Sequence, residues 1–179
     1  NNWKNNCVLA KLVYVYEGIE PESPKSKRHK LVNPHYFSGV YDGADNAKLW
    51  DEVYAYLDSH YDLKKVKKIY LNADGGTWIQ SGKKRIAGIT SVLDEFHLQK
   101  YLLKMTSHMK DSVDDARKEL CDAIKSGTKA DFQSVVERLK VCAGTEATEK
   151  RIEESGAYIL SNWIAAKIRL KHRETVKGC

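Results

Sequence analysis

Strand-like patterns occur only before residue 94 of this 179-residue sequence, and this limit constrains the fold more than any other feature. Segments rich in Val, Ile, Leu and Tyr, which favour strands, occur before residue 94. Beyond that point apolar residues recur at a helical spacing. The sequence therefore predicts an α/β layer followed by an all-helical segment.

Four segments of the first part are predicted strands. They span residues 7–16, 35–41, 66–73 and 87–93. The first two can form an antiparallel pair, joined by a loop or exposed hairpin tip at 18–33. A helix is predicted over 46–60, where Leu49, Trp50 and Val53 share one face. The last two strands flank a short helix at 77–81, which favours parallel pairing.

The second part of the sequence is predicted to contain helices alone. Their apolar spacing gives helices at 94–109, 111–125, 131–141 and 146–169. Ser126-Gly127 and Gly144-Thr145 separate the last three. The last of them is expected to be one long, uninterrupted helix.

Composition narrows the class of protein. Hydrophobic residues make up 42% of the chain, enough to build a core. Lys and Arg number 30 against 24 Asp and Glu, which gives a net charge of +6. A basic balance favours anionic partners such as nucleic acid, although many ordinary domains are mildly basic too.

The cysteines and the lack of a long apolar run indicate a cytoplasmic protein without a membrane partner. None of the four cysteines (Cys7, Cys121, Cys142 and Cys179) forms a Cys-x-x-Cys pair, which argues against a zinc ribbon. Their number suits reduced thiols better than a disulfide scaffold. No apolar run approaches the length of a membrane span. The missing initiator Met and the abrupt stop predict a piece cut from a longer protein.

Asp74 is the first candidate site residue. It directly follows a predicted buried strand and precedes Gly75 and Gly76. Open α/β sheets bind ligands at the carboxyl ends of their strands, and Mg²⁺ prefers carboxylate oxygens. Asp74 is therefore a candidate metal ligand. The alternative is an ordinary Asp-Gly turn in which Asp74 caps the helix beginning at Thr77.

Asp94 and His97 form the second candidate constellation. They are three residues apart at the start of a predicted helix, so they can share one face of its first turn. Such a pair could bind a metal, orient a catalytic carboxylate or contact a phosphate. The alternative is a helix N-cap at Asp94 with a local hydrogen bond from His97.

Short basic runs supply the candidate DNA-binding residues. These are Lys27, Arg28 and Lys30 in the first run and Lys83, Lys84 and Arg85 in another. Further runs lie at 64–68 and 167–173. Lys and Arg gathered on one surface neutralise phosphates and make binding depend on salt. The alternative is that the runs are solvated faces without a partner.

Several of these segments together resemble one known family. Residues 12–18, 36–41, 69–78 and 93–101, including Asp-Gly-Gly-Thr-Trp-Ile and Leu-Asp-Glu-Phe-His-Leu, are similar to insertion-sequence transposases of the ISLre group. These belong to the DDE transposases. The resemblance is densest between Leu12 and Met105 and thinner through the terminal helices.

The resemblance implies a partial ribonuclease H-like mixed sheet over 1–109 and a helical insertion over 110–179. It also implies metal-dependent DNA cleavage and strand transfer, with three carboxylates holding two Mg²⁺ or Mn²⁺ ions. Asp74 matches the second carboxylate, while Asp94 and His97 resemble an Asp-x-x-His motif of Mutator-like relatives. The other two carboxylates are expected outside this chain, so the chain alone should be inactive and should hold no metal.

The partners that the resemblance implies are transposon ends, target DNA and further copies of the protein. Two other functions stay open from the sequence. One is a nucleic-acid-binding module without catalysis, supported by the net charge. The other is a self-association module formed by the helical part.

Overall fold

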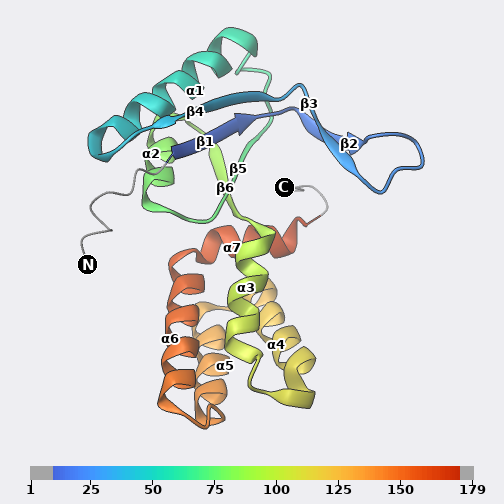
Figure 1. Ribbon diagram of the computed structural model, residues 1–179, viewed down its shortest axis with the longest axis vertical. Coiled ribbons are helices and arrows are strands. Elements are labelled where there is room, and N and C mark those ends of the chain that lie inside the picture. The colour runs from blue at the N-terminus through green and yellow to red at the C-terminus, as the bar shows by residue number, and fades with distance from the viewer. Residues whose placement is uncertain (1–9, 174–179) are drawn as a thin grey trace. The chain divides into compact units, whose positions relative to one another are not determined.

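A computed structural model describes residues 10–173 and shows two compact units (Figure 1). The N-terminal unit comprises 10–69 and 76–89 of these residues, and the helical unit comprises 70–75 and 90–173. The chain is a mixed α/β protein, which confirms the coarse prediction. A ribonuclease H-like sheet and a division near residue 109 remain predictions.

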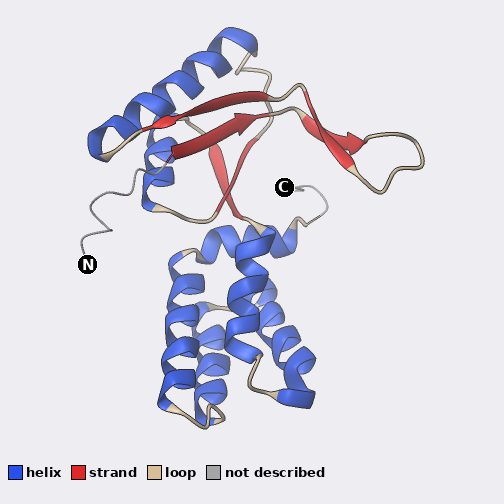
Figure 2. Ribbon diagram, in the orientation of Figure 1, coloured by secondary structure: helices blue, strands red, loops and turns tan. Residues whose placement is uncertain are grey.

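Two antiparallel strand pairs form the sheet structure of the N-terminal unit (Figure 2). Strand β1 (Ala10–Val15) pairs with β4 (His35–Val40), and β2 (Gly18–Pro21) pairs with β3 (His29–Val32) as a hairpin. The predicted antiparallel pair and the predicted hairpin are confirmed. The predicted strand residues 7–9 lie outside the described part of the chain.

Helices α1 (Asn46–His60) and α2 (Thr77–Arg85) supply the core of the N-terminal unit. Trp50 is buried between them, and its indole N–H donates to the Trp78 carbonyl oxygen at 3.0 Å. Gly82 lies against this indole, since a Cβ there would come within 2.7 Å of the ring. The predicted bounds of α1 are confirmed, and α2 extends past its predicted end at Ser81.

Strands β5 (Ile69–Ala73) and β6 (Ile89–Leu93) form a further two-stranded sheet. Their carboxyl ends meet, because the Asp94 N–H donates to the Ala73 carbonyl oxygen at 3.0 Å. The two strands therefore run in the same direction, as predicted. Each ends at one of the candidate carboxylates.

Helices α3 to α6 of the helical unit pack as a closed ring (Figure 1). They are α3 (Glu95–Thr106), α4 (Val113–Ser126), α5 (Lys129–Val141) and α6 (Glu146–Ser161), and α7 (Trp163–Lys171) packs on α4. Leu98, Leu120, Phe132 and Ile152 point inward and are completely buried. The amphipathic spacing read from the sequence is thus the inner face of the ring.

The prediction of one long helix over 146–169 is wrong. The helix stops at Ser161, and Asn162 adopts φ −105° and ψ 22° before α7 begins. The Asn162 side-chain amide donates to the Tyr158 carbonyl oxygen at 3.1 Å. Short polar side chains bond to nearby backbone in this way and interrupt helices.

Two further predictions concern the cysteines and membranes. Cys121 and Cys142 are free thiols, whereas Cys7 and Cys179 lie outside the described residues. Between residues 10 and 173, no helix combines the length and the apolar character needed to cross a membrane.

Candidate functional site

The carboxyl ends of β5 and β6 place Asp74 and Asp94 at neighbouring strand ends. Asp74 follows Ala73 and is exposed, while the side chain of Asp94 is 16% exposed. The hydrogen bond from the Asp94 N–H to the Ala73 carbonyl oxygen fixes this arrangement. The two acids therefore lie at the sheet edge where open α/β sheets bind ligands.

Asp94 holds His97 in two ways. Its carboxylate caps α3 by accepting the His97 backbone N–H at 2.8 Å, and it lies 2.9 and 3.0 Å from His97 Nδ1. The predicted N-cap alternative is thus confirmed, and it coexists with a direct side-chain pair. A carboxylate bonded to Nδ1 fixes the orientation of the imidazole ring and leaves Nε2 for another partner.

The other candidate role for Asp74, as the cap of α2, is wrong. The N-cap of that helix is Gly76, two residues after Asp74. Gly75 has a positive φ of 82°, a conformation that glycine adopts without strain. A Cβ at Gly75 would also collide with the Asn162 side chain.

Tyr158 fastens this loop to α6. Its hydroxyl donates to the Asp74 carbonyl oxygen, and its ring stacks on Tyr101 with 3.7 Å between centroids. Burial raises the pKa of Tyr158 above its ordinary value, and Tyr101, Asp74 and Asp94 add to the rise. The phenol therefore stays a neutral donor, and both candidate acids are close enough to act on it.

Arg169 is a site residue that the sequence analysis missed. It is only 3% exposed, its Nε donates to the Leu93 carbonyl oxygen at 2.8 Å, and its Nη2 donates to Asn72 Oδ1. One buried guanidinium thus ties together the ends of β5 and β6. A signal existed, because Trp163, Ala166 and Arg169 are three residues apart and share the buried face of α7.

Lys167 and Arg173 of the basic run at 167–173 also have partners within the chain. Lys167 donates to the Gly127 carbonyl oxygen at 2.8 Å, and Arg173 pairs with Glu95 at 2.6 Å. These contacts connect α7 and the residues after it to other parts of the helical unit. Lys167, Arg169 and Arg173 therefore serve contacts within the helical unit.

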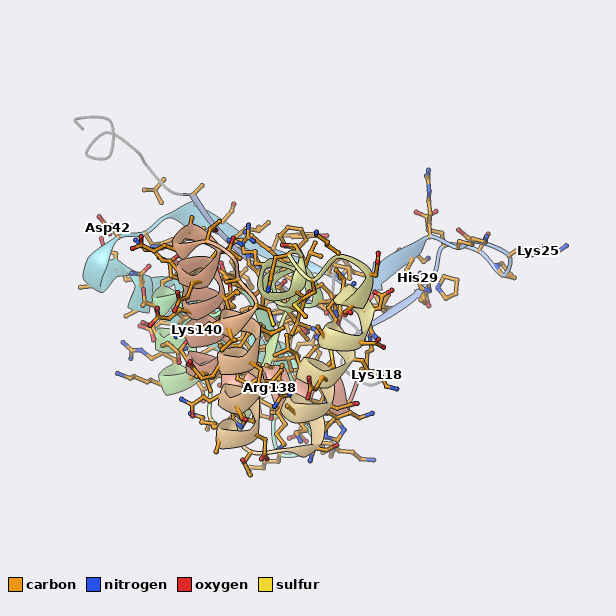
Figure 3. All side chains as sticks on the ribbon, turned by 90° about the horizontal axis from the view of Figure 1, so that it is seen from below. Lys25, His29, Asp42, Lys118, Arg138 and Lys140 are labelled. Atoms are coloured by element: carbon orange, nitrogen blue, oxygen red, sulfur yellow. The ribbon has the colours of Figure 1, made fainter. Side chains whose placement is uncertain are left out.

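The first set of predicted DNA-binding residues lies on the exposed β2–β3 hairpin. Lys27 and Arg28 are in or beside its tip, and Lys30 pairs with Glu20 across the hairpin at 3.1 Å. Figure 3 shows Lys25 at the far end of the hairpin, with His29 at the start of β3. Their role in DNA binding stays a prediction.

The second set occupies the last turn of α2. Lys83, Lys84 and Arg85 are exposed, and Arg85 pairs with Asp51 of α1 at 3.4 Å. The positive charges lie at the carboxyl end of the helix, where the helix dipole favours them. This accounts for the run without a ligand, so its DNA contact also remains a prediction.

A complete metal site is not formed by the described residues. Over residues 10–173, no group of three or more His, Cys, Asp and Glu side chains is arranged to hold a metal ion. Asp74 and Asp94 have the oxygen chemistry that Mg²⁺ prefers, but that ion needs near-octahedral ligation. They fit such an ion as part of a ligand set.

Comparison with known proteins identifies similar sequences but no function. The pattern of the Uncharacterised protein family (UPF0236) matches residues 4–178. The chain is 36% identical over 169 residues to UPF0236 protein TTE0402 of Caldanaerobacter subterraneus subsp. tengcongensis, covering 94% of this chain and 32% of that protein.

Two further relatives show the same relation. A second protein of that organism, whose name joins eleven labels from TTE0033 to TTE2212, is 34% identical over 94% of this chain and 34% of its own length. The UPF0236 protein in vanSb 3'region of Streptococcus gallolyticus is 26% identical over 86% of this chain and 33% of its own. The chain thus spans about a third of these relatives. No solved structure matches it significantly.

Proposed function

We propose that this chain, which belongs to the Uncharacterised protein family UPF0236, is part of a DDE transposase that cuts and joins DNA strands. The observation that carries the proposal is the meeting of β5 and β6, which places Asp74 and Asp94 side by side in the fold. This arrangement agrees with the resemblance, in which Asp74 is the second metal carboxylate and Asp94 and His97 form the Asp-x-x-His motif that follows it. The resemblance to ISLre-group transposases supplies the identity of the reaction.

Asp74 would be a ligand of the divalent ions. It is exposed at the strand end, where further carboxylates from the rest of a longer protein could approach. Bound Mg²⁺ or Mn²⁺ supplies Lewis-acid activation of an attacking hydroxyl and stabilisation of the leaving oxygen. The chain alone, with an incomplete ligand set, would be inactive.

His97 would contact the phosphate at which the strand is cut, and Asp94 would hold the imidazole ring in place. The carboxylate holds Nδ1, so the imidazole presents Nε2 in a fixed orientation. Protonated Nε2 can donate to a phosphate oxygen, and neutral Nε2 can accept a proton from water. The hydrogen bond at Nδ1 fixes the ring in either case.

Tyr158 and Arg169 would hold the acids in place without touching the substrate. Tyr158 bonds the Asp74 backbone, and Arg169 bonds the residue before Asp94 and the side chain two residues before Asp74. Catalytic groups must be held within fractions of an ångström by the residues around them. Tyr158 lies on α6 and Arg169 on α7, the last two helices of the helical unit.

The names of two relatives agree with a mobile element. One name joins four labels and another joins eleven, all of the same form and from one organism. We take the joined labels as separate copies of one sequence, which repeated transposition would leave behind. The partners proposed here are therefore transposon ends and target DNA in the cytoplasm, with a homo-oligomer as the working form.

The alternative is a nucleic-acid-binding or self-association module without catalysis. One observation favours it: beyond β6 the described chain consists of helices alone, and these pack together as a ring. The net charge of +6 suits nucleic-acid binding under either proposal.

The deciding experiment measures Mg²⁺-dependent strand cleavage by the full-length protein carrying Asp74→Asn. We expect cleavage to fall by about a hundredfold or more, because the amide loses the charge of a metal ligand. Asp58→Asn, at an exposed position of α1, is the matched control and should leave cleavage unchanged. Cleavage that survives Asp74→Asn would remove Asp74 from the reaction, and full-length protein that binds DNA but never cuts it would favour the alternative.

A further inference from the structure

A pocket on the outside of the helical unit lies beside the candidate site. Its volume is about 570 Å³, and residues of α3, α4 and α6 line it. This volume is within the range of small-molecule sites. The pocket lies wholly within the helical unit, so the arrangement of its walls is fixed by the packing of these helices.

The lining combines an apolar surface with positive charge. Phe96 and Leu103 are 69% and 48% exposed, and Lys100, Lys104, Arg117 and Arg151 surround them. Within residues 10–173, Lys100, Lys104 and Arg151 form no ion pair. Such a surface attracts a ligand that is both anionic and flat.

The negative charge in the lining is already compensated. Glu95 also lines the pocket, but its Oε1 accepts from Arg173 at 2.6 Å and from Gln99 at 3.0 Å, while its Oε2 is buried without a hydrogen-bond partner among the described residues. Arg117 donates to Gln99 at 2.7 Å and is 4.0 Å from the exposed Asp114. The pocket therefore keeps a positive balance.

Phe96 connects the pocket to the candidate site. Its ring meets the His97 imidazole edge to face, with 5.2 Å between the centroids. The Lys100 ammonium lies over the Phe96 ring, 5.8 Å from its centroid. A strand with its phosphate at His97 could thus continue along α3 with a base on Phe96.

We infer that this pocket binds an unpaired nucleotide of a nucleic-acid strand, with the base against Phe96 and Leu103 and the phosphates against the surrounding cations. Exposed aromatics beside Lys and Arg recognise single strands in this way, because every base has a flat face for stacking. The path of the strand from this pocket to His97 rests on the proposed function, whereas binding in the pocket itself does not. An acidic peptide matches the charge but does not use the exposed ring.

The test measures binding of a short fluorescent poly(dT) strand to this 179-residue chain in EDTA at several salt concentrations. We expect Phe96→Ala to weaken binding about tenfold and Phe96→Trp to preserve it, because stacking needs a ring. Lys100→Glu should weaken binding at least about tenfold and lower the salt slope, since that slope counts phosphate contacts. Lys118→Glu, at an exposed position on α4, is the charge-matched control (Figure 3).

Several results would overturn the inference. These are no binding of poly(dT), full binding by Phe96→Ala, an equal loss with Lys118→Glu, or competition by polyglutamate as strong as that by unlabelled poly(dT). Thermal unfolding of each variant separates lost binding from lost folding. Because no metal is present, the outcome is independent of whether Asp74→Asn abolishes cleavage.

Discussion

The two units of the molecule bury their apolar side chains to different extents. In the helical unit, Leu98 and Leu120 are fully enclosed by the ring of helices. In the N-terminal unit, Leu12, Tyr36 and Val40 lie on one face of the β1–β4 pair and are 56%, 58% and 63% exposed. A closed ring encloses side chains on all sides, whereas a two-stranded sheet leaves much of its surface open.

This difference indicates where the folding free energy comes from. The helical unit gains most from apolar burial, so substitutions in its core should be costly. The N-terminal unit depends on fewer contacts, among which the packing of α1 on α2 through Trp50 stands out. Four substitutions, two in each unit, test this contrast.

The largest effect is expected for Leu120→Ala in the helical unit. Leu120 is completely buried in the ring, and removing its side chain leaves a cavity. We expect a loss of about 2–5 kcal/mol in the free energy of unfolding, measured by denaturant titration. The exposed Leu12→Ala is the matched control. Similar losses for the two would contradict the contrast between the units.

The next effect is expected for Gly82→Ala in the N-terminal unit. The new Cβ would press on the Trp50 ring at 2.7 Å, and overpacking of this kind costs about 1–3 kcal/mol. The better helix propensity of alanine offsets part of this cost. Lys83→Ala, at an exposed position on the same helix, should be nearly neutral. A stabilised Gly82→Ala protein would show that α1 and α2 can separate slightly at little cost.

A smaller effect is expected for Tyr158→Phe, which removes the hydrogen bond to the Asp74 backbone. The loss should be about 1 kcal/mol at neutral pH. Burial raises the pKa of Tyr158 from 10.0, so the phenol contributes fully below pH 10 and loses its contribution as the pH rises through the folded value. The gap between wild type and Tyr158→Phe in thermal unfolding should therefore narrow above pH 10. A gap that widens there would contradict this assignment.

The smallest effect is expected for Val40→Ser on the open face of the β1–β4 pair. Because Val40 is 63% exposed, the change should alter the free energy of unfolding by no more than about 0.5 kcal/mol. Thermal unfolding measures this directly. A loss above about 1 kcal/mol would mean that the face is covered in solution.

Local sequence patterns predicted the helices and strands whose formation depends on residues close to one another in the sequence. The apolar spacing in 46–60 gave α1 with its observed bounds, and alternating or β-branched residues gave β1, β4, β5 and β6. Asp94 at the start of α3 was predicted as a cap because cap chemistry involves residues three apart. In these cases the decisive neighbours are within one helical turn or one strand.

The features that the sequence did not predict depend on distant partners. The break at Asn162 accompanies its close packing against Gly75, far away in the chain. The spacing of Arg169 from Trp163 and Ala166 indicates its burial, but only the strand ends beside it show what its guanidinium binds. The pocket beside Phe96 requires side chains from three helices. Periodicity describes one element at a time and carries no such information.

The contacts of Tyr158 and Arg169 with the strand ends also limit how the molecule can be shortened. Residues 70–75, which include Asp74, belong to the helical unit, and the residues that grip them come from α6 and α7. A truncated protein ending before α6 would keep every strand and both acids yet lose their anchors. Any minimal version engineered to preserve the geometry of the strand ends must therefore extend to Lys171.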